Sequence, residues 1–260
     1  MKQIVYSRPK IVIIDQQLTL KKFILLFSSI FYILIVNGQG IYNYREWGVG
    51  TDVSYIKGYT NITRQYNHAA VDASFFYNYS PYLPIAVELQ SGQLSGGGQS
   101  LNLDPFGRAY TNNYFALILH ADVHLGSMID YEDDFFLNIV KNFYFGSGAG
   151  LVYNNNTVIR HPYYSPLYTF PGSDNSINLD IPFRFGYEFK LYDNYHMEPS
   201  MAFDIGYIHS IVFGSGLDGY NDPRDIFRHQ SQDQYRQITI GFKYFFGNIV
   251  SYNKPIKTFR

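Results

Sequence analysis

The chain has 260 residues, a formal net charge of −1 and no cysteine; 16% of its residues are charged and 19% are aromatic. The absence of cysteine excludes disulfides, zinc–thiolate sites and the acylated cysteine of a lipoprotein, and the near-zero net charge argues against nucleic acid as a partner. The charged fraction lies well below the roughly 25% of a typical soluble protein.

The first segment, residues 1–38, has the features of an export signal peptide. Two lysines precede an apolar run over residues 23–36, which is shorter than the roughly 20 residues of a membrane-spanning helix. Gly38 is a small residue at the expected cleavage site before Gln39. The alternative interpretation is an uncleaved N-terminal anchor.

The rest of the chain repeats an alternation of period two, which indicates strands with one apolar and one polar face. In the clearest run one face carries Ile238, Ile240, Phe242, Tyr244 and Phe246, and the other carries Gln237, Thr239, Gly241 and Lys243. In chain order the pattern predicts strands over residues 46–57, 68–79, 85–94, 114–125, 143–154, 179–190, 197–209 and 237–246.

The predicted connections alternate in length. Those rich in Gly, Asn, Asp, Ser and Pro are long and cover residues 58–67, 95–113, 155–178 and 210–233, whereas residues 80–84 and 191–196 are short turns. Residues 126–142 break this rule, because they fall among the short turns but are long. Early acids followed by apolar residues near helical spacing predict a short amphipathic helix there. It would cap the mouth of a barrel or bind a partner.

Each predicted strand is near the roughly 9–11 residues that a tilted membrane-spanning strand needs. The chain is therefore predicted to form a closed eight-stranded antiparallel transmembrane β-barrel, with short periplasmic turns and long extracellular loops. The barrel is assigned to residues 39–246 and a periplasmic C-terminal tail to residues 247–260. An even strand number places both termini in the periplasm. The competing fold is a soluble ligand-binding barrel, whose faces would be inverted.

The last predicted strand carries a polar residue, a glycine two positions on, and aromatic residues three and five positions beyond the glycine: Thr239, Gly241, Tyr244 and Phe246. On these residues and on the alternation, residues 46–246 resemble the small outer-membrane β-barrel proteins of the OmpA-like and porin-like group, in the style of the Bacteroidetes. Most members end at the final aromatic residue, whereas this chain continues to Arg260. The resemblance implies a bacterial outer membrane, with its lipid and lipopolysaccharide as surroundings and the barrel-assembly machinery as a partner during insertion.

The polar strand faces carry many charged residues: Asp52, Asp72, Glu88, Asp122, Asp180, Arg184, Glu188, Lys190, Asp204 and Lys243. The interior of an eight-stranded barrel is only wide enough for side chains to fill it, so these charges must pair there. We expect a closed, salt-bridged lumen in which Glu88, Glu188 or Asp204 neutralises Arg184. The alternative is a narrow gated pore or an ion site.

His120, Asp122 and His124 share one strand face and are the best candidate for a metal site. Same-face neighbours are roughly 6.8 Å apart, so the two histidines lie roughly 13 Å apart. A single ion, which needs its nitrogens near ~2 Å, would hardly reach both. We therefore predict a structural network and no metal site.

An enzymatic function is an alternative hypothesis, because the chain resembles the lipid-A deacylase family in size and strand count. That family's signature is a histidine with a serine two residues on, whereas His209 and Ser210 are adjacent and so face opposite ways on a strand. Nucleophile-elbow, zinc-helix and phosphate-loop motifs are absent from the sequence. We predict no catalytic, cofactor-binding or metal residues, and a non-enzymatic role in envelope integrity or surface interaction. The alternatives are a lipid-A-modifying hydrolase using His209 and a narrow porin.

The predicted outer loops hold many aromatic residues and aspartates: Tyr110, Tyr163, Tyr164, Tyr168, Phe170, Asp218, Tyr220, Asp222 and Asp225. They would serve either as loop packing and interfacial aromatics or as an exposed site for a sugar, a lipid or a protein.

Overall fold

The computed structural model describes residues 42–131, 134–161, 167–192, 198–223 and 232–253. The predicted signal peptide lies outside these residues, as do Tyr163, Tyr164 and Asp225. The strands of the described part are β1 (Tyr42–Tyr59), β2 (Gln65–Ser80), β3 (Leu83–Gly97), β4 (Ala109–His124), β5 (Phe143–Val158), β6 (Asn175–Tyr192), β7 (Pro199–Phe213) and β8 (Gln234–Tyr252). Two short helices, the 3-10 turn η1 (Leu125–Ser127) and α2 (Phe135–Val140), join β4 to β5.

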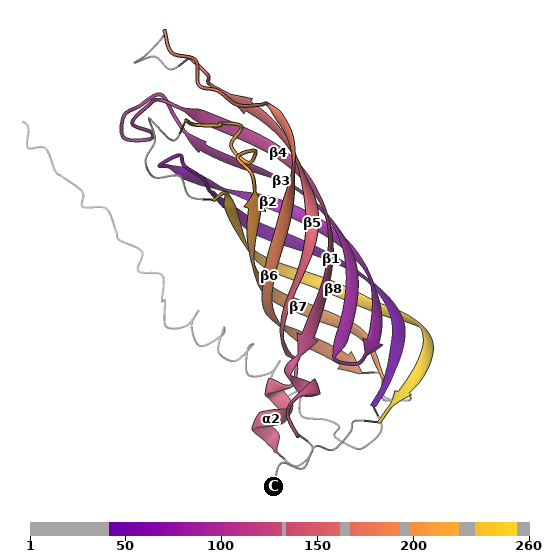
Figure 1. Ribbon diagram of the computed structural model, residues 1–260. Coiled ribbons are helices and arrows are strands. Elements are labelled where there is room, and N and C mark those ends of the chain that lie inside the picture. The colour runs from indigo at the N-terminus through magenta and orange to yellow at the C-terminus, as the bar shows by residue number, and fades with distance from the viewer. Residues whose placement is uncertain (1–41, 132–133, 162–166, 193–197, 224–231, 254–260) are drawn as a thin grey trace, which may run out of the picture. The chain divides into compact units, whose positions relative to one another are not determined.

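The strands form one closed barrel in the order β1 to β8, and every strand pairs antiparallel with its neighbours in sequence (Figure 1). Pairing of β1 with β8 closes the sheet, from Tyr42 opposite Tyr252 to Tyr59 opposite Gln234. The predicted closed, eight-stranded antiparallel fold is confirmed. None of the helices in the described part of the chain is long and apolar enough to cross a membrane.

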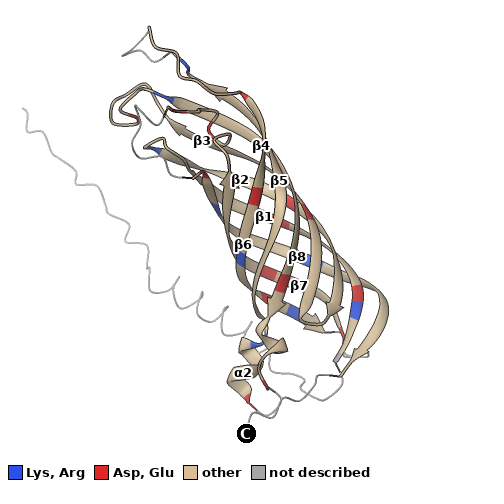
Figure 2. Ribbon diagram, in the orientation of Figure 1, with Lys and Arg blue, Asp and Glu red and all other residues tan. Residues whose placement is uncertain are grey.

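The period-two alternation places apolar side chains on the outside and polar ones inside. On β1, for example, Val53 is 61% exposed, whereas its neighbours Asp52 and Ser54 are buried. Acidic and basic positions therefore lie along the bodies of the strands as well as in the loops (Figure 2). The inverted faces expected of a soluble ligand barrel are not observed among the described strands.

Three glycines on the inner face of β5 make room for large side chains on β4. Gly146, Gly148 and Gly150 pair with Asp122, His120 and Ile118. A Cβ added at Gly148 would lie 2.1 Å from the carbonyl oxygen of Leu119, and one at Gly146 would lie 2.0 Å from the Asp122 carboxylate. The glycines thus let these charged and bulky side chains turn into a narrow interior.

The predicted boundary between barrel and tail is wrong, because β8 does not end at Phe246. The strand continues to Tyr252, and the β1–β8 register shifts between Arg45 and Trp47. Opposite this shift, Gly247 adopts a φ of +89°, which favours glycine. An extra residue at such a bulge exchanges the two faces of a strand, so the alternation that predicted β8 is interrupted there.

The strands also extend beyond their predicted bounds at the other end. The connection between β1 and β2 covers only residues 60–64, so the predicted long loop over residues 58–67 is wrong. The connections over residues 98–108, 159–174 and 214–233 remain long. The predicted short helix within residues 126–142 is confirmed as α2.

Candidate functional site in the barrel lumen

The centre of the lumen holds an ion-pair cluster around Arg184 of β6. Its Nη1 donates to Glu88 Oε2 of β3 at 2.8 Å, and its Nε lies 3.4 Å from Asp122 Oδ1 of β4. His120 lies between the same two carboxylates, with Nε2 3.3 Å from Glu88 and Nδ1 3.3 Å from Asp122. The expected neutralisation of Arg184 by Glu88 is confirmed, and Asp122 is a second partner that the sequence did not single out.

Two glutamines extend this cluster across the barrel. Gln90 Nε2 donates to Glu88 Oε1 at 2.7 Å, and Gln237 Nε2 of β8 donates to Gln90 Oε1 at 3.0 Å. All three side chains are almost completely buried. A continuous polar chain therefore runs from β8 through Gln90 and Glu88 to Arg184.

A second cluster, nearer to α2, is centred on Glu188. Lys243 Nζ lies 2.8 Å from Glu188 Oε2 and 3.5 Å from Asp204 Oδ2, and Lys190 Nζ lies 3.6 Å from Glu188 Oε1. Asp204 also accepts from the Tyr144 hydroxyl at 2.9 Å. Glu188 and Asp204 are thus partners of lysines rather than of Arg184, which corrects the expectation that either would neutralise the arginine.

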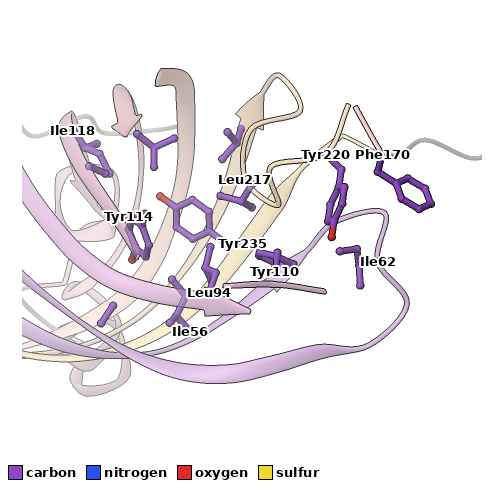
Figure 3. Close-up of a cluster of buried hydrophobic side chains, with 14 residues drawn as sticks. Ile56, Ile62, Leu94, Tyr110, Tyr114, Ile118, Phe170, Leu217, Tyr220 and Tyr235 are labelled. Atoms are coloured by element: carbon purple, nitrogen blue, oxygen red, sulfur yellow. The ribbon is translucent and has the colours of Figure 1, made fainter. Parts of the chain in front are cut away.

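The opposite half of the lumen is filled by apolar and aromatic side chains (Figure 3). Tyr114 and Tyr235 approach each other with ring centroids 5.7 Å apart, and the Tyr235 hydroxyl donates to Asp180 at 2.5 Å. We call this the apolar plug; its members include Ile56, Leu94, Tyr110, Tyr114, Ile118, Val152, Val212, Leu217, Tyr220 and Tyr235. The lumen is therefore closed twice, by ion pairs in one half and by the plug in the other.

Arg108 connects the loops that lie above the plug. Its guanidinium donates to both carboxylate oxygens of Asp104, at 3.0 and 3.1 Å, and to Asp222. It also lies 5.7 Å from the ring centre of Phe170 and 5.8 Å from that of Tyr220. One cation thus joins the connection before β4 to those before β6 and β8.

Two buried aspartates of the β7–β8 connection, Asp218 and Asp233, have raised pKa values. Burial raises the pKa of Asp218 to about 6, with a further contribution from Asp222. Burial, and then the neighbouring Asp218, raise the pKa of Asp233 well above its ordinary value. These carboxyls hold protons most readily when the loops are packed.

Asp52 and Asp72 form a buried carboxylate pair of a different kind. They face each other in the β1–β2 register, and within the described ranges neither forms an ion pair with a basic side chain. Each has an Oδ1 atom that is buried without a hydrogen-bond partner. The β1–β2 wall therefore carries two buried carboxyl groups side by side.

The packed side chains leave little free space between the clusters. A cavity of about 30 Å³ lies among residues that include Asp52, Glu88, His120, Arg184 and Lys243. A water molecule needs about 10–15 Å³ by this measure, so the cavity holds no more than a few waters.

The candidate metal constellation of His120, Asp122 and His124 is divided between the two clusters. His120 contacts Glu88 and Asp122, whereas His124 Nε2 lies 3.6 Å from Glu188. Over the described residues, no group of three or more histidine and carboxylate side chains is arranged to hold a metal ion.

His209 and Ser210 lie on opposite faces of β7. Ser210 is completely buried in the interior, whereas His209 is half-buried on the outer side. Their side chains therefore point apart, as the adjacent positions predicted.

The loop residues considered for surface binding are mostly buried. Tyr110, Tyr220 and Phe170 belong to the plug, and Asp218 and Asp222 pack beside Arg108. These side chains close the barrel rather than present an exposed surface. An open cleft of about 360 Å³ does lie between the β5–β6 and β7–β8 connections; it is lined by Gly172, Ser173, Ser176, Asn178, Ser215, Gly216 and Asn221.

The sequence patterns did not predict the plug or the contacts that Arg108 makes with the loops. Ile118, Tyr114 and Tyr235 occupy inward positions of their strands, and their size was the available signal. Leu217 and Phe170 come from loops, where no alternation exists to assign a face.

Fold and interior together define a small closed β-barrel with a filled lumen. No protein-family model matches the chain, and no curated protein sequence matches it. Neisserial surface protein A is similar in structure, with 13% identity and a TM-score of 0.44 over 80% of this chain and 100% of that chain. Ail, the attachment invasion locus protein of Yersinia pestis, solved with the heparin analogue sucrose octasulfate, has 10% identity and a TM-score of 0.41 over 78% and 99%.

The outer membrane protein AlkL, solved in lipid bilayers, has 14% identity and a TM-score of 0.39 over 85% of this chain and 97% of that chain.

Proposed function

We propose that this protein is a non-enzymatic β-barrel of a bacterial outer membrane, with a closed lumen, that serves envelope integrity or surface interaction. The observation that supports this proposal best is that apolar side chains lie on the outside of the barrel wall and charged ones on the inside. Val53, Ile177 and Ile240 are 61%, 67% and 64% exposed on the outside, while the charged side chains of the strands are buried inside with the apolar plug. Water would disfavour such an outer surface, whereas lipid favours it.

Aromatic residues near one end of the wall support the same location. Trp47 packs against Phe75 and Tyr77, with ring centroids 5.4 and 4.8 Å apart, and Tyr187 packs against Phe143 at 4.7 Å. Bands of aromatic residues are typical of the two interfaces of a membrane barrel. In this proposal the α2 end, where both described chain ends meet in the β1–β8 ladder, faces the periplasm. The long connections over residues 98–108, 159–174 and 214–233 face outward.

The location is tested by fractionation of cells that express the full chain. The protein is expected in the outer-membrane fraction, soluble only in detergent, and its gel migration should change on heating because a closed barrel resists unfolding by detergent. Recovery of folded protein from a detergent-free periplasmic extract would contradict the proposal.

The absence of enzymatic activity is tested separately. Mass spectra of lipid A from cells with and without the protein are expected to be identical. Loss of an acyl chain that depends on the protein and disappears in His209→Ala would establish the hydrolase instead. A matched His68→Ala variant controls for loss of another strand histidine, since His68 bonds Ser95 within the sheet.

A further inference from the structure

The helix α2 is attached to the outer wall of the barrel. The hydroxyl of Tyr187, a half-buried residue on the outer face of β6, donates to the carbonyl oxygen of Ile139 at 3.1 Å. The helix starts at the Asp134 cap, whose carboxylate accepts from the Leu137 amide at 2.9 Å. Figure 1 shows α2 just below the lower end of the barrel. The helix itself is therefore docked at the rim of the barrel.

The wall beside α2 is aromatic and belongs to the lipid-facing band. Tyr187 packs against Phe143 at 4.7 Å and against Phe189 at 4.5 Å, and Phe143 stacks on Phe185 at 6.5 Å. Phe185 is 58% exposed on the same outer face. The helix thus lies where the apolar band of the wall ends.

The α2 segment presents apolar side chains that the barrel does not cover. Phe135 and Phe136 are 64% and 68% exposed, and Met128, just after η1, is 60% exposed. Burial of such side chains away from water is favourable, so their exposure to water would forgo that stabilisation. We call Met128, Phe135 and Phe136 the rim surface.

We propose that the rim surface inserts into the headgroup–acyl boundary of the membrane leaflet at the α2 end and anchors the barrel at a fixed depth. This inference rests on the proposed membrane location. Lipid is the chosen occupant because the Tyr187–Ile139 bond makes the rim surface continuous with the aromatic, lipid-facing wall. Interfacial helices of this kind bury their apolar face about 5–10 Å into the boundary.

The charges nearby indicate which headgroups suit the rim surface. Asp130 and Asp134 are exposed beside it, while Lys141, which follows the helix, is buried and lies over the Tyr131 ring at 4.7 Å. Exposed acids without an exposed described cation disfavour an anionic membrane surface. The rim surface therefore fits zwitterionic phospholipid.

The single tryptophan of the chain makes the test direct. Trp47 lies on the lipid-facing wall and reports on the barrel itself in the wild type. In a Trp47→Phe background, Phe136→Trp and Phe135→Trp report on the rim surface, and Leu101→Trp, 58% exposed in the β3–β4 connection, reports on water. Each full-length variant is reconstituted in phosphatidylcholine vesicles with brominated acyl chains, and heat-modifiable migration selects the folded protein.

Bromines near the headgroup end of the acyl chains are expected to quench the Phe136→Trp emission at least as strongly as they quench Trp47. Aqueous acrylamide is expected to quench it much less than Leu101→Trp. The Phe135→Trp variant provides a second reading if the first substitution disturbs folding.

The inference is overturned if acrylamide quenches both rim reporters as strongly as Leu101→Trp while bromine quenches only Trp47. The helix would then lie in water, as expected of a binding site for a soluble partner. The proposed membrane location of the barrel would remain supported, because Trp47 would still be quenched by bromine. If bromine fails to quench Trp47 as well, the proposed location falls together with the inference.

Discussion

At the scale of single residues, Arg184 is the side chain on which the central cluster depends. Its replacement by alanine leaves Glu88 and Asp122 as buried carboxylates with only His120 between them. Breaking a buried ion pair in this way typically costs about 3–5 kcal/mol. We expect the Arg184→Ala barrel to lose about 3 kcal/mol of unfolding free energy, measured by urea titration in vesicles.

The matched control is Arg236→Ala on the exposed outer side of β8, where the guanidinium lies 4.3 Å from the Tyr59 ring. Its cost should stay within about 1 kcal/mol, as for exposed cation–π contacts. Equal losses in both variants would mean that Arg184 contributes no more than a surface arginine.

In contrast to Arg184, replacement of Asp72 is expected to stabilise the barrel. It faces Asp52 across the β1–β2 ladder, and two buried carboxyl groups so close together are stable only when one of them holds a proton, which costs free energy at neutral pH. Asp72→Asn keeps the shape and is neutral without taking up a proton, so it should raise the urea midpoint at neutral pH. A midpoint lowered by the substitution would show that both carboxyl groups are needed, for example to hold a cation.

At the scale of elements, the inner face of β5 depends on glycine. Gly148→Val introduces a Cβ that meets the Leu119 carbonyl oxygen at 2.1 Å and His120 at 2.7 Å. The next residue, Ala149, is exposed on the outer side, so Ala149→Val adds the same volume toward lipid. We expect the first variant to yield no heat-modifiable barrel and the second to fold like the wild type. Folding of both would refute the packing argument.

The loop junction above the plug should loosen as the pH rises. Asp218, with a pKa of about 6, faces Asp222, Arg108 and Thr60, and Asp233 is raised further. Because the folded pKa of Asp218 lies above its unfolded value of roughly 4, the folded state binds more protons between these values. The stabilisation is therefore complete below about pH 4 and falls as the pH rises toward 6.

The measurement is the amide-exchange protection factor of Leu217 and Tyr220, which corrects for the intrinsic pH dependence of exchange. Protection is expected to be higher at pH 4 than at pH 7, and Asp218→Asn should reduce the difference. Protection that increases with pH would contradict the assigned sign.

The strands and the helix also show which parts of the fold can be predicted from the sequence. Alternation identified every strand core, because one side chain in two must face lipid or the interior. It failed at Gly247, where a bulge exchanges the faces and β8 continues to Tyr252. Alternation did not predict that the polar ends of β1 and β2 remain hydrogen-bonded to neighbouring strands. It also did not predict that α2 docks on the wall through Tyr187. Both outcomes depend on pairing partners far away in the chain.

For the charged cluster, the sequence predicted which kinds of side chain must pair better than it predicted which individual residues meet. That Arg184 would need a buried carboxylate followed from the cost of an unpaired charge, and Glu88 was among the expected partners. The choice of Asp122 over Glu188 depends on the β4–β5–β6 register, in which Gly146 separates Asp122 from Arg184. Register of that kind is not readable from alternation alone.

At the scale of the whole molecule, the two closures of the lumen lie in series, and either one alone should stop ions. The wild type is therefore expected to give no steady current in planar bilayers. Tyr114→Ala with Tyr235→Ala opens the plug but leaves the Arg184 and Glu188 clusters in place. This variant should also be silent, provided that its heat-modifiable migration shows a folded barrel.

Conduction should require that both halves are opened. Adding Glu88→Ala, Gln90→Ala and Arg184→Ala, together with Glu188→Ala and Lys243→Ala, to the plug variant removes one carboxylate and one cation from each charged cluster, so that fewer unpaired charges are left than after a single substitution. Brief or sustained openings are expected only in this combined variant. A large ohmic current from the wild type would refute the closed lumen and favour the narrow porin. A current from the plug variant alone would show that the ion-pair half is permeable, leaving Tyr114, Tyr235 and their neighbours as the only barrier in the described interior.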